Sequence, residues 1–417
     1  TWCRIGSAGM RIPCRKKRFL LFIATVSFVY FFILLTFHID PSSSGFHEFT
    51  KCPACYGDGL CPNLSNLQLT GWSRLSILRY LNVKNVFYGH LNGRKVVVKK
   101  LAHDSELLGT DTKLCKGSGL SDVNVCNVAS AVETTLGEGK DRVSTLIRFM
   151  NQFRTNQDAT TCPHPRFVEK VLDAVTRNAA TLAARDNRLD PVAVVAYTSA
   201  VNPEPLILQA FPRHEGWPFP TYLGSCGRLV VEMDAGTPLS SYEGADWLTR
   251  VSLAEQLLGI AQQLTDNPTG FALYLTDVSM DNFAVSETGT VTVVDVENVI
   301  VVDRFQLVQE RKPGWNKRAQ HLVDACHDCL SFDSAELCSH YTADHNYYAI
   351  CSGLLAPRAY YSLRGGLLHS VPTDVNGRFG LSRILAACDL PRGNYSRFDA
   401  APALRAALQR VLEERVS

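Results

Sequence analysis

The chain has 417 residues, of which 46% are hydrophobic and 20% are charged, so it carries enough apolar material for a large core and its composition is not that of a disordered protein. Its formal net charge is +2, but the first 18 residues hold six basic residues and no acidic one, which leaves −4 for the remainder. Because no basic patch with interleaved aromatic residues is present, we expect no nucleic acid partner.

The N-terminal region combines a basic cluster with a long uncharged run. "RKKR" at residues 15–18 is followed by an apolar stretch from Phe19 to Phe37. As a helix this stretch would span roughly 28 Å, close to the hydrocarbon thickness of a bilayer. We therefore expect a signal anchor or a signal peptide, and favour the anchor because the run is longer than a usual signal-peptide core. The basic tail would remain cytosolic and the rest would enter the lumen.

Fourteen cysteines are many for a cytosolic enzyme, and twelve of them follow the apolar run. An even number suits disulfide pairing in an oxidising compartment. The pairs Cys52/Cys55 and Cys326/Cys329 also fit zinc or redox motifs, but they lie too far apart in sequence for one zinc site and are flanked by loop residues, so we predict structural disulfides. Two glycosylation sequons favour the same compartment: Asn63-Leu64-Ser65 and Asn394-Tyr395-Ser396.

The first half of the chain predicts a sheet interrupted by helices. "NVFYGHLNGRKVVVKKL" is typical of a β-hairpin that turns at Asn92-Gly93. Residues 103–165 resemble an insertion with short helices, and helical periodicity follows at 166–184 and 190–201. The apolar run in "PEPLILQAF" predicts a short strand.

The second half predicts a linker, a long helix and a polar loop between strands. "GRLVVEMDAG" predicts a strand that enters a Gly/Pro turn at 236–238, and residues 247–266 form an amphipathic helix pattern. "NFAVS" and "TVTVVDVENVIVV" predict two strands separated by a turn at Thr288-Gly289. The remaining third of the chain is helical in pattern and rich in cysteine.

Four polar residues recur at positions that suit phosphoryl transfer. Lys99 ends the second hairpin strand, Asp277 and Asn282 are five residues apart in "DVSMDN", and Asp295 follows in "VVDVEN". Each has an ordinary interpretation by itself, such as a solvated lysine at a strand end. In this order and on these elements they resemble a protein kinase, in which the lysine binds nucleotide phosphates, the first aspartate accepts the hydroxyl proton, and the asparagine and second aspartate hold the metal.

Longer blocks resemble one family more closely, the divergent protein kinase domain 2 family, also called Deleted in Autism-like proteins. These blocks include "KCPAC", "NPEPLILQAFP", "FALYLTDVSMDNFAV" and "VVDVENVIVVD". The resemblance implies a two-lobed kinase-like α+β fold, with a sheet lobe followed by a helical lobe, and residence in the Golgi, the secretory pathway or the extracellular space. We expect these segments: cytosolic tail 1–18, anchor or signal peptide 19–38, stalk and Cys-rich segment 39–70, N-lobe with insertion 71–235, and C-lobe 236–417.

Several parts of an ordinary kinase are replaced. No G-x-G-x-x-G precedes Lys99, Ser279 stands in place of the lysine that follows the catalytic aspartate, and no A-P-E motif is present. D-F-G has become Asp295-Val296-Glu297, and Glu297 is interpreted either as an additional metal ligand or as a cap on a rigid segment. Leu275-Thr276 replaces His-Arg, which removes the usual partner of a phosphorylated activation loop.

Some roles remain open in the sequence. The acid that pairs with Lys99 is not identifiable; the candidates are Glu169, Asp186 and Asp190, with Asp190 slightly preferred. Asp281 is interpreted as a solvated loop acid. Asp344 either anchors the catalytic loop or caps a helix.

Two functions follow from these observations. One is a lumenal kinase that uses ATP with Mg or Mn to phosphorylate a hydroxyl of a protein or glycan. The other is a pseudokinase, Golgi-resident or secreted, that acts as a signalling or binding protein toward an unidentified lumenal or extracellular protein. A structural receptor ectodomain is a weaker third class, because the acidic residues would then have no purpose. Contact with a membrane is expected through residues 19–37 unless they are cleaved.

Overall fold

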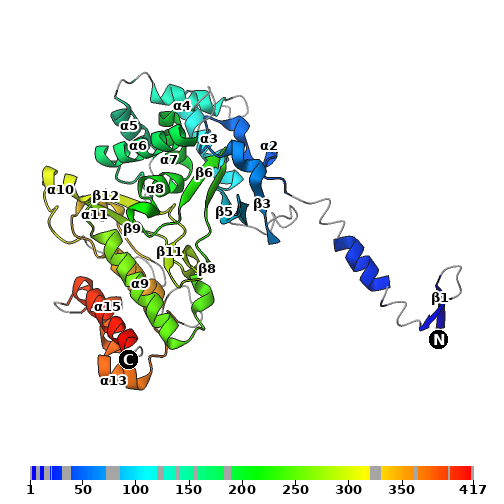
Figure 1. Cartoon of the computed structure of the whole chain (residues 1–417). Coiled ribbons are helices and arrows are strands. Elements are labelled where there is room, and N and C mark those ends of the chain that lie inside the picture. The colour runs from blue at the N-terminus through cyan, green and yellow to red at the C-terminus, as the bar shows by residue number, and fades with distance from the viewer. Residues whose placement is uncertain are drawn as a thin grey trace.

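The computed structural model of the chain describes residues 2–5, 10–13, 19, 21–30, 39–71, 85–119, 126–137, 139, 141–153, 158–182, 189–319, 330–357, 359, 365–392 and 395–414. The short elements at the N-terminal end are β1 (Trp2–Ile5), β2 (Met10–Pro13) and α2 (Ser44–His47). Beyond them the chain forms a sheet lobe with attached helices and a second lobe that is mostly helical (Figure 1).

The first lobe is built on a five-stranded antiparallel sheet. Its spatial order is β3-β4-β5-β7-β6, and its strands are β3 (Leu67–Leu69), β4 (Val86–Leu91), β5 (Arg94–Lys100), β6 (Tyr222–Cys226) and β7 (Leu229–Met233). The predicted hairpin of β4 and β5 is confirmed. Asn92 and Gly93 at its turn have φ angles of 50° and 78°, as the type I′ turn favoured by Asn-Gly requires.

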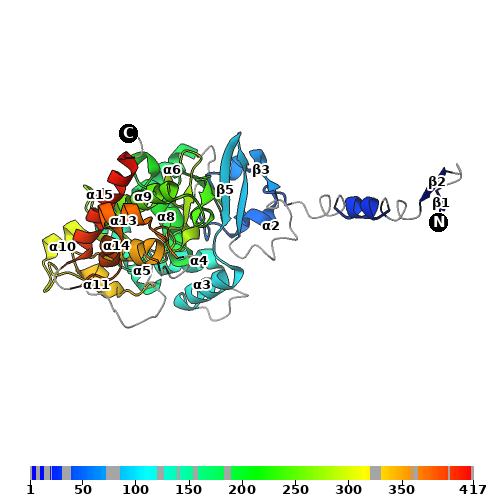
Figure 2. The same ribbon diagram turned by 90° about the horizontal axis from the view of Figure 1, so that it is seen from below.

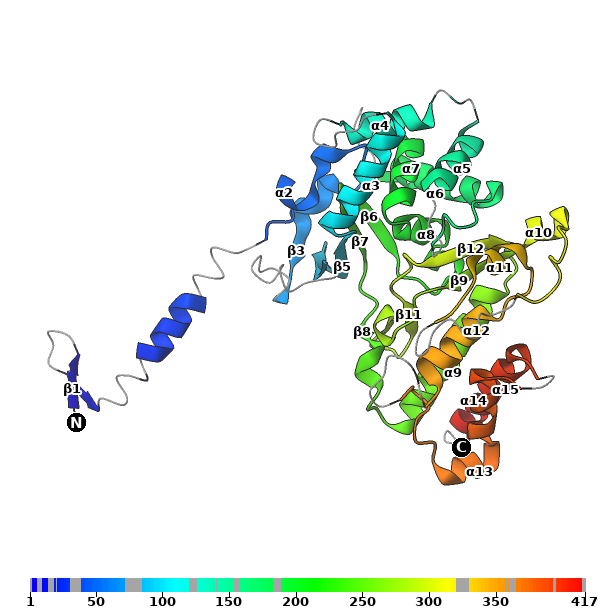
Figure 3. The same ribbon diagram turned by 180° about the vertical axis from the view of Figure 1, so that it is seen from behind.

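Between β5 and β6 the described residues form six α-helices. They are α3 (Asp104–Gly117), α4 (Val128–Leu136), α5 (Arg142–Phe153), α6 (Pro165–Leu182), α7 (Pro191–Val201) and α8 (Glu204–Ala210). Figures 1 and 3 show them gathered beside the sheet at the upper end of the molecule. The helices predicted within residues 103–165 are therefore confirmed, as are the two helices predicted after them.

The strand predicted in "PEPLILQAF" is wrong, because this segment forms helix α8. All seven of its residues are buried, and Pro205 occupies a position in its first turn. A short apolar run that is buried on every side has no periodicity with which to distinguish a strand from a helix. A proline at the start of a helix is well tolerated.

A linker joins β7 to the second lobe. It continues into β8 (Thr237–Pro238), which pairs with β10 (Phe283–Val285). Gly236 in the linker has a φ angle of +114°, and a Cβ atom there would lie 2.1 Å from the carbonyl oxygen of Val285. Only glycine lets the linker pass this close to β10.

The second lobe begins with the long predicted helix, α9 (Trp247–Thr265), followed by β9 (Phe271–Leu275). The strand predicted from Thr290 to Val302 is in fact two strands, β11 (Val291–Val293) on β10 and β12 (Val299–Asp303) on β9. Residues 294–298 leave the ladder between them. Asp295, Glu297 and Asn298 lie in this connection and are all partly exposed, which a central strand would not permit.

The remaining α-helices of the described chain follow in the second lobe. They are α10 (Arg304–Glu310), α11 (Ser334–Ser339), α12 (His345–Ile350), α13 (Thr373–Phe379), α14 (Leu381–Asp389) and α15 (Arg397–Glu413). Figure 2 shows α13, α14 and α15 beside α9, and α15 contacts both α9 and α14. One apolar core extends from the helices of the first lobe through α9 to α15, and a second lies under the sheet against α2 and β3.

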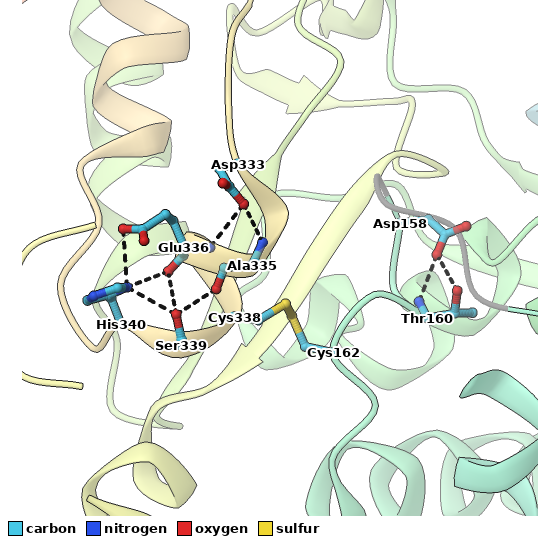
Figure 4. Close-up of a disulfide and its surroundings, with 9 residues drawn as sticks. All are labelled: Asp158, Thr160, Cys162, Asp333, Ala335, Glu336, Cys338, Ser339 and His340. Atoms are coloured by element: carbon cyan, nitrogen blue, oxygen red, sulfur yellow. Dashed lines mark hydrogen bonds and ion pairs between the residues drawn. A yellow bond between two sulfur atoms is a disulfide. The ribbon is translucent and has the colours of Figure 1, made fainter. Parts of the chain in front are cut away.

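Five disulfides connect the described residues: Cys52–Cys55, Cys61–Cys226, Cys115–Cys126, Cys162–Cys338 and Cys351–Cys388. The predicted disulfide of the first pair is formed, whereas Cys326 and Cys329 lie outside the described residues. Cys162–Cys338 joins the segment before α6 to α11, where Asp333 caps the helix through the N–H of Ala335 (Figure 4). The helices next to the sheet are therefore covalently tied to the second lobe.

An ion pair also joins α6 to the second lobe. Arg166 at the start of α6 donates through Nε to Asp303 Oδ2 at 2.7 Å, and a second guanidinium nitrogen contacts the other oxygen. Asp303 ends β12 and also caps α10 through the N–H groups of Phe305 and Gln306. Because one buried carboxylate serves α6, β12 and α10, these elements are held as one unit.

In the described ranges, no helix is both long and apolar enough to cross a bilayer. The run predicted as a signal anchor is described at Phe19 and residues 21–30, which are helical with exposed apolar side chains. The anchor or signal peptide stays a prediction.

Candidate active site

A cavity of about 490 Å³ lies between the sheet and the loops of the second lobe. Its walls come from β4, β5, β7, the linker, β10 and the segment after β11, and its apolar lining includes Val86, Val97, Phe283, Ala284 and Val294. Within the described residues, the backbone of the linker residue Ala235 makes no hydrogen bond. Two apolar walls and an unbonded backbone edge form a slot that suits a flat heterocycle.

Lys99 marks the inner end of this cavity. Strand alternation places Val97 and Lys99 on the same face of β5. The ammonium group donates to Glu204 Oε1 at 2.9 Å and to the carbonyl oxygen of Val294 at 2.6 Å. It also lies 3.2 Å from Glu232 Oε1 on the neighbouring strand β7.

Neither acid that pairs with Lys99 was among the sequence candidates. Asp190, the preferred candidate, caps α7 by accepting from the N–H of Val192, Glu169 is exposed on α6, and Asp186 lies outside the described residues. Glu204 belongs to the segment "PEPLILQAF", for which the sequence predicts a strand. The order Asn-Pro-Glu-Pro before an apolar run is typical of a helix start with an acid in the first turn. This pattern is the sequence signal that points to Glu204.

The charges at Lys99 do not balance. Both glutamate side chains are 2% exposed, and one ammonium group faces both. Burial would lower the pKa of Lys99, but Glu204, Glu232 and Asp295 outweigh it and raise that pKa. Burial, with Glu204 and Asp295 opposing Lys99, raises the pKa of Glu232 to about 8. The cluster is therefore most stable with one glutamate ionised and the other protonated.

Asp295 lies where β11 ends and faces the cavity. It is half-buried, and its carboxylate takes part in no hydrogen bond within the described residues. Glu297 accepts a hydrogen bond from Asn202 in the turn before α8. Burial, together with Asp295 and Glu204, raises the pKa of Glu297 to about 7. The contact with Asn202 suits the second interpretation of Glu297, a cap on a rigid segment; its metal role stays a prediction.

The loop after β9 holds Asn282 firmly. Asn282 is buried, accepts from Ser279 Oγ at 3.0 Å, and donates to the backbone carbonyl of Asp277 at 3.2 Å. The backbone carbonyl of Asn282 accepts a hydrogen bond from the N–H of Val294 at 2.9 Å. Ser279, which replaces a lysine of ordinary kinases, thus positions the amide of Asn282. Asp277 itself is exposed.

Asp281 is more than a solvated acid. It is exposed, but its carboxylate accepts from Ser240 Oγ at 2.6 Å and it lines the cavity. The expected solvated position is confirmed, and the contact with Ser240 and the place at the cavity are added by the structure. The physical reason is that the single helical turn from Met280 to Asn282 directs neighbouring side chains to opposite sides, one into the protein and one toward the cavity mouth.

The two residues that follow Asp344, His345 and Asn346, anchor strand β9, which leads into the loop of Asp277 and Asn282. His345 Nε2 donates to the carbonyl of Leu275 at 2.8 Å. Asn346 accepts from the N–H of Leu275 at 3.0 Å and donates to the carbonyl of Leu273 at 2.9 Å. Asp344 contacts Arg397 at 3.5 Å and makes no side-chain capping bond. The expected anchor therefore comes from the adjacent residues of the same helix.

Oxygen donors at the cavity suit a hard divalent cation. Asp295 and Asp281 both line it, and Mg²⁺ is commonly held by one or two carboxylates together with substrate phosphates. Among the described residues, no group of three His, Cys, Asp or Glu side chains is arranged to hold a metal without such help. These residues fit a metal that arrives with a nucleotide.

A five-stranded lobe, a linker and a helical lobe around a buried Lys–Glu pair and a cavity aspartate define a kinase-like domain. The family described as "Protein-kinase domain of FAM69" matches residues 196–391. The chain is 38% identical to divergent protein kinase domain 2A of Xenopus tropicalis over 381 residues, covering 88% of each protein, with the same values for the Homo sapiens protein. It is 39% identical over 122 residues to human divergent protein kinase domain 2B, covering 29% of this chain and 28% of that protein. The chain belongs to the divergent protein kinase domain 2 family, as its sequence blocks predicted.

Proposed function

We propose that the chain binds ATP with Mg²⁺ or Mn²⁺ in this cavity and transfers phosphate to a hydroxyl group of a lumenal or extracellular protein or glycan. The observation that carries the proposal is the Lys99–Glu204 pair, at 2.9 Å, beside the unbonded carboxylate of Asp295 on one cavity wall. An interaction protein has no need of a buried ion pair beside an uncompensated acid, since both are costly.

Each of these side chains has a separate role in the proposed reaction. Lys99 binds phosphate oxygens of the nucleotide, and Asp295, with Asp281 or Asn282, provides oxygens for the metal, which neutralises charge on the phosphates. Asp277 is exposed, so an acceptor hydroxyl on a large substrate can reach it. The acceptor oxygen bonds to the γ-phosphorus, the bond from phosphorus to the ADP oxygen breaks, and the hydroxyl proton passes to Asp277.

The second candidate is a pseudokinase that binds a nucleotide without efficient transfer. It is favoured by Asn282, whose side-chain oxygen is buried and already bonded to Ser279. In either case we propose a secretory-pathway location, in the Golgi lumen or outside the cell. The five disulfides support it, because such bonds persist in oxidising compartments. Residues 19–37 would hold the chain at a membrane unless they are removed.

Thermal unfolding of the full chain with ATP and Mg²⁺ or Mn²⁺ tests binding. We expect a higher midpoint with nucleotide and metal for wild type, loss of this shift in Asp295→Ala, and retention in the control Asp173→Ala, an exposed acid on α6. No shift with any metal would refute nucleotide binding. Transfer of labelled phosphate to casein or to a mixture of glycans, lost in Asp277→Ala, separates the kinase from the pseudokinase.

A further inference from the structure

Three acceptor groups lie around the ammonium group of Lys99. An ammonium group has three protons. Lys99 donates to Glu204 at 2.9 Å and to the carbonyl of Val294 at 2.6 Å, and the carboxylate of Glu232 lies 3.2 Å from the nitrogen as a third, ion-pair partner. A phosphate oxygen that approaches Lys99 must therefore displace one of these three acceptors.

Glu232 is the least firmly held of the three. Val294 is a backbone group, and Glu204 is held from its other oxygen by the N–H of Val296 at 3.4 Å. Glu232 makes the longest contact, and its second oxygen, Oε2, is buried without a hydrogen-bond partner in the described part of the chain. An unpaired buried oxygen costs free energy that a rearrangement of this side chain can recover.

Glu232 also lies on the path that a ligand must take. In the pairing of β5 with β7, Glu232 is opposite Val97, and Lys99 is opposite Val230. Glu232 thus lies between the linker, which starts at Asp234, and the ammonium group. A ligand that reaches from the linker backbone to Lys99 passes directly over it.

The groups around Glu232 are mostly acidic. It faces Lys99 from β5, Glu204 from α8 and Asp295 from the segment after β11, and the same cavity contains Asp234, Asp281 and Tyr88. If Lys99 turned to a phosphate, Glu232 would be a buried carboxylate without a cation. Such a group takes up a proton, because the neutral acid costs far less to bury. Its pKa is already raised to about 8, first by burial.

We propose that Glu232 is an internal competitor of the ligand for Lys99: its carboxylate occupies the ammonium proton that a ligand phosphate needs, and binding of the phosphate displaces and protonates it. The inference rests on the proposed function, because a nucleotide is the ligand that brings a phosphate to Lys99. Nucleotide binding is then coupled to the uptake of one proton at alkaline pH and is tightest under neutral to acidic conditions.

Titration calorimetry of the full chain with Mg-ATP tests this. Three proteins are compared with wild type: Glu232→Gln, Glu232→Leu in case the amide perturbs folding, and the control Glu48→Gln. Glu48 is a matched control because it pairs with Lys100, at 2.6 Å, the next residue of the same strand. Measurements at pH 6.5 and 8.5, in buffers of different ionisation enthalpy, give both the affinity and the number of protons taken up.

At pH 8.5 we expect Glu232→Gln and Glu232→Leu to bind about 10- to 100-fold more tightly than wild type, the range for loss of a competing charged hydrogen bond. Wild type should take up close to one proton there, both Glu232 variants should not, and Glu48→Gln should match wild type. At pH 6.5 the difference in affinity should shrink. The inference would be overturned if wild type bound Mg-ATP as tightly as the Glu232 variants at pH 8.5, or if Glu48→Gln also bound it more tightly than wild type. Either result would leave the proposed function standing. No binding in any of the proteins at either pH would overturn the proposed function itself.

Discussion

Replacing Lys99 with methionine should destabilise the protein in a manner that depends strongly on pH. The substitution keeps the length of the side chain but removes the only cation that contacts Glu204 and Glu232 among the described residues, and both acids are 2% exposed. Near pH 8 the ionised glutamate of the pair then loses its cation, which costs about 3–5 kcal/mol in the free energy of unfolding. Near pH 5 both acids can be neutral, and the loss falls to about 1–3 kcal/mol for the missing hydrogen bonds.

The sign of the pH effect follows from the raised pKa values. Both acids have folded-state pKa values above the 4.5 of an unfolded glutamate, so their ionisation removes stability as the pH rises from 4.5 through the folded-state pKa. Losing Lys99 raises these pKa values further and enlarges the effect. Urea unfolding at several pH values measures it. The control is Lys95→Met on the same strand, where Lys95 pairs with Glu287 at the surface and little change is expected. Equal losses for Lys99→Met at pH 5 and pH 8 would refute the reasoning.

Three further changes test other parts of the structure. Although burial opposes the shift, hydrogen bonds from Lys100 and Lys51 lower the pKa of Glu48 to about 2. The contribution of Glu48 to the free energy of unfolding, about 1–2 kcal/mol after allowance for partial exposure, should therefore disappear as the pH falls from 4.5 to 2. In acid unfolding, Glu48→Gln should begin from a lower stability than wild type and show a shallower dependence on pH. Removing the 162–338 disulfide by a double alanine substitution should cost on the order of 4 kcal/mol, because it closes a long loop, and an unchanged melting temperature would contradict its proposed link between the lobes. Asn346→Ala leaves two buried backbone groups of β9 unpaired and should cost about 2–4 kcal/mol in urea unfolding; a loss below 1 kcal/mol would show that water replaces the amide.

The links between the lobes bear on how the cavity can change. Helix α6 is joined to the second lobe by Cys162–Cys338 and by the Arg166–Asp303 ion pair. Glu204 lies on α8, which packs against α6, so the acid that pairs with Lys99 is indirectly anchored to the second lobe. A displacement of Glu204 away from Lys99 would have to strain these links. The small movement of the Glu232 side chain on β7 is the less costly response to a ligand.

Local sequence determined the features that depend on short-range chemistry. Asn92-Gly93 specifies the hairpin turn, because few other dipeptides accept positive φ angles at both positions. Asp277 and Asn282 are placed by their spacing within one loop, and Asp295 follows within the same strand-loop-strand unit. The sequence blocks shared with the family also predicted the kinase-like fold.

Tertiary structure alone decided which residues face one another across long separations. Glu204 is 105 residues from Lys99, and Glu232 lies on another strand, so neither pairing leaves a pattern in the sequence near the lysine. Complete burial of helix α8 removes the periodicity that distinguishes a helix from a strand, so the sequence does not show that Glu204 lies in a first helical turn. The partner of each distant cysteine was equally undetermined. The sequence thus predicted the polar residues of the candidate site, while packing decided that Lys99 pairs with two acids, because a buried ammonium group binds whatever carboxylates the fold brings within reach.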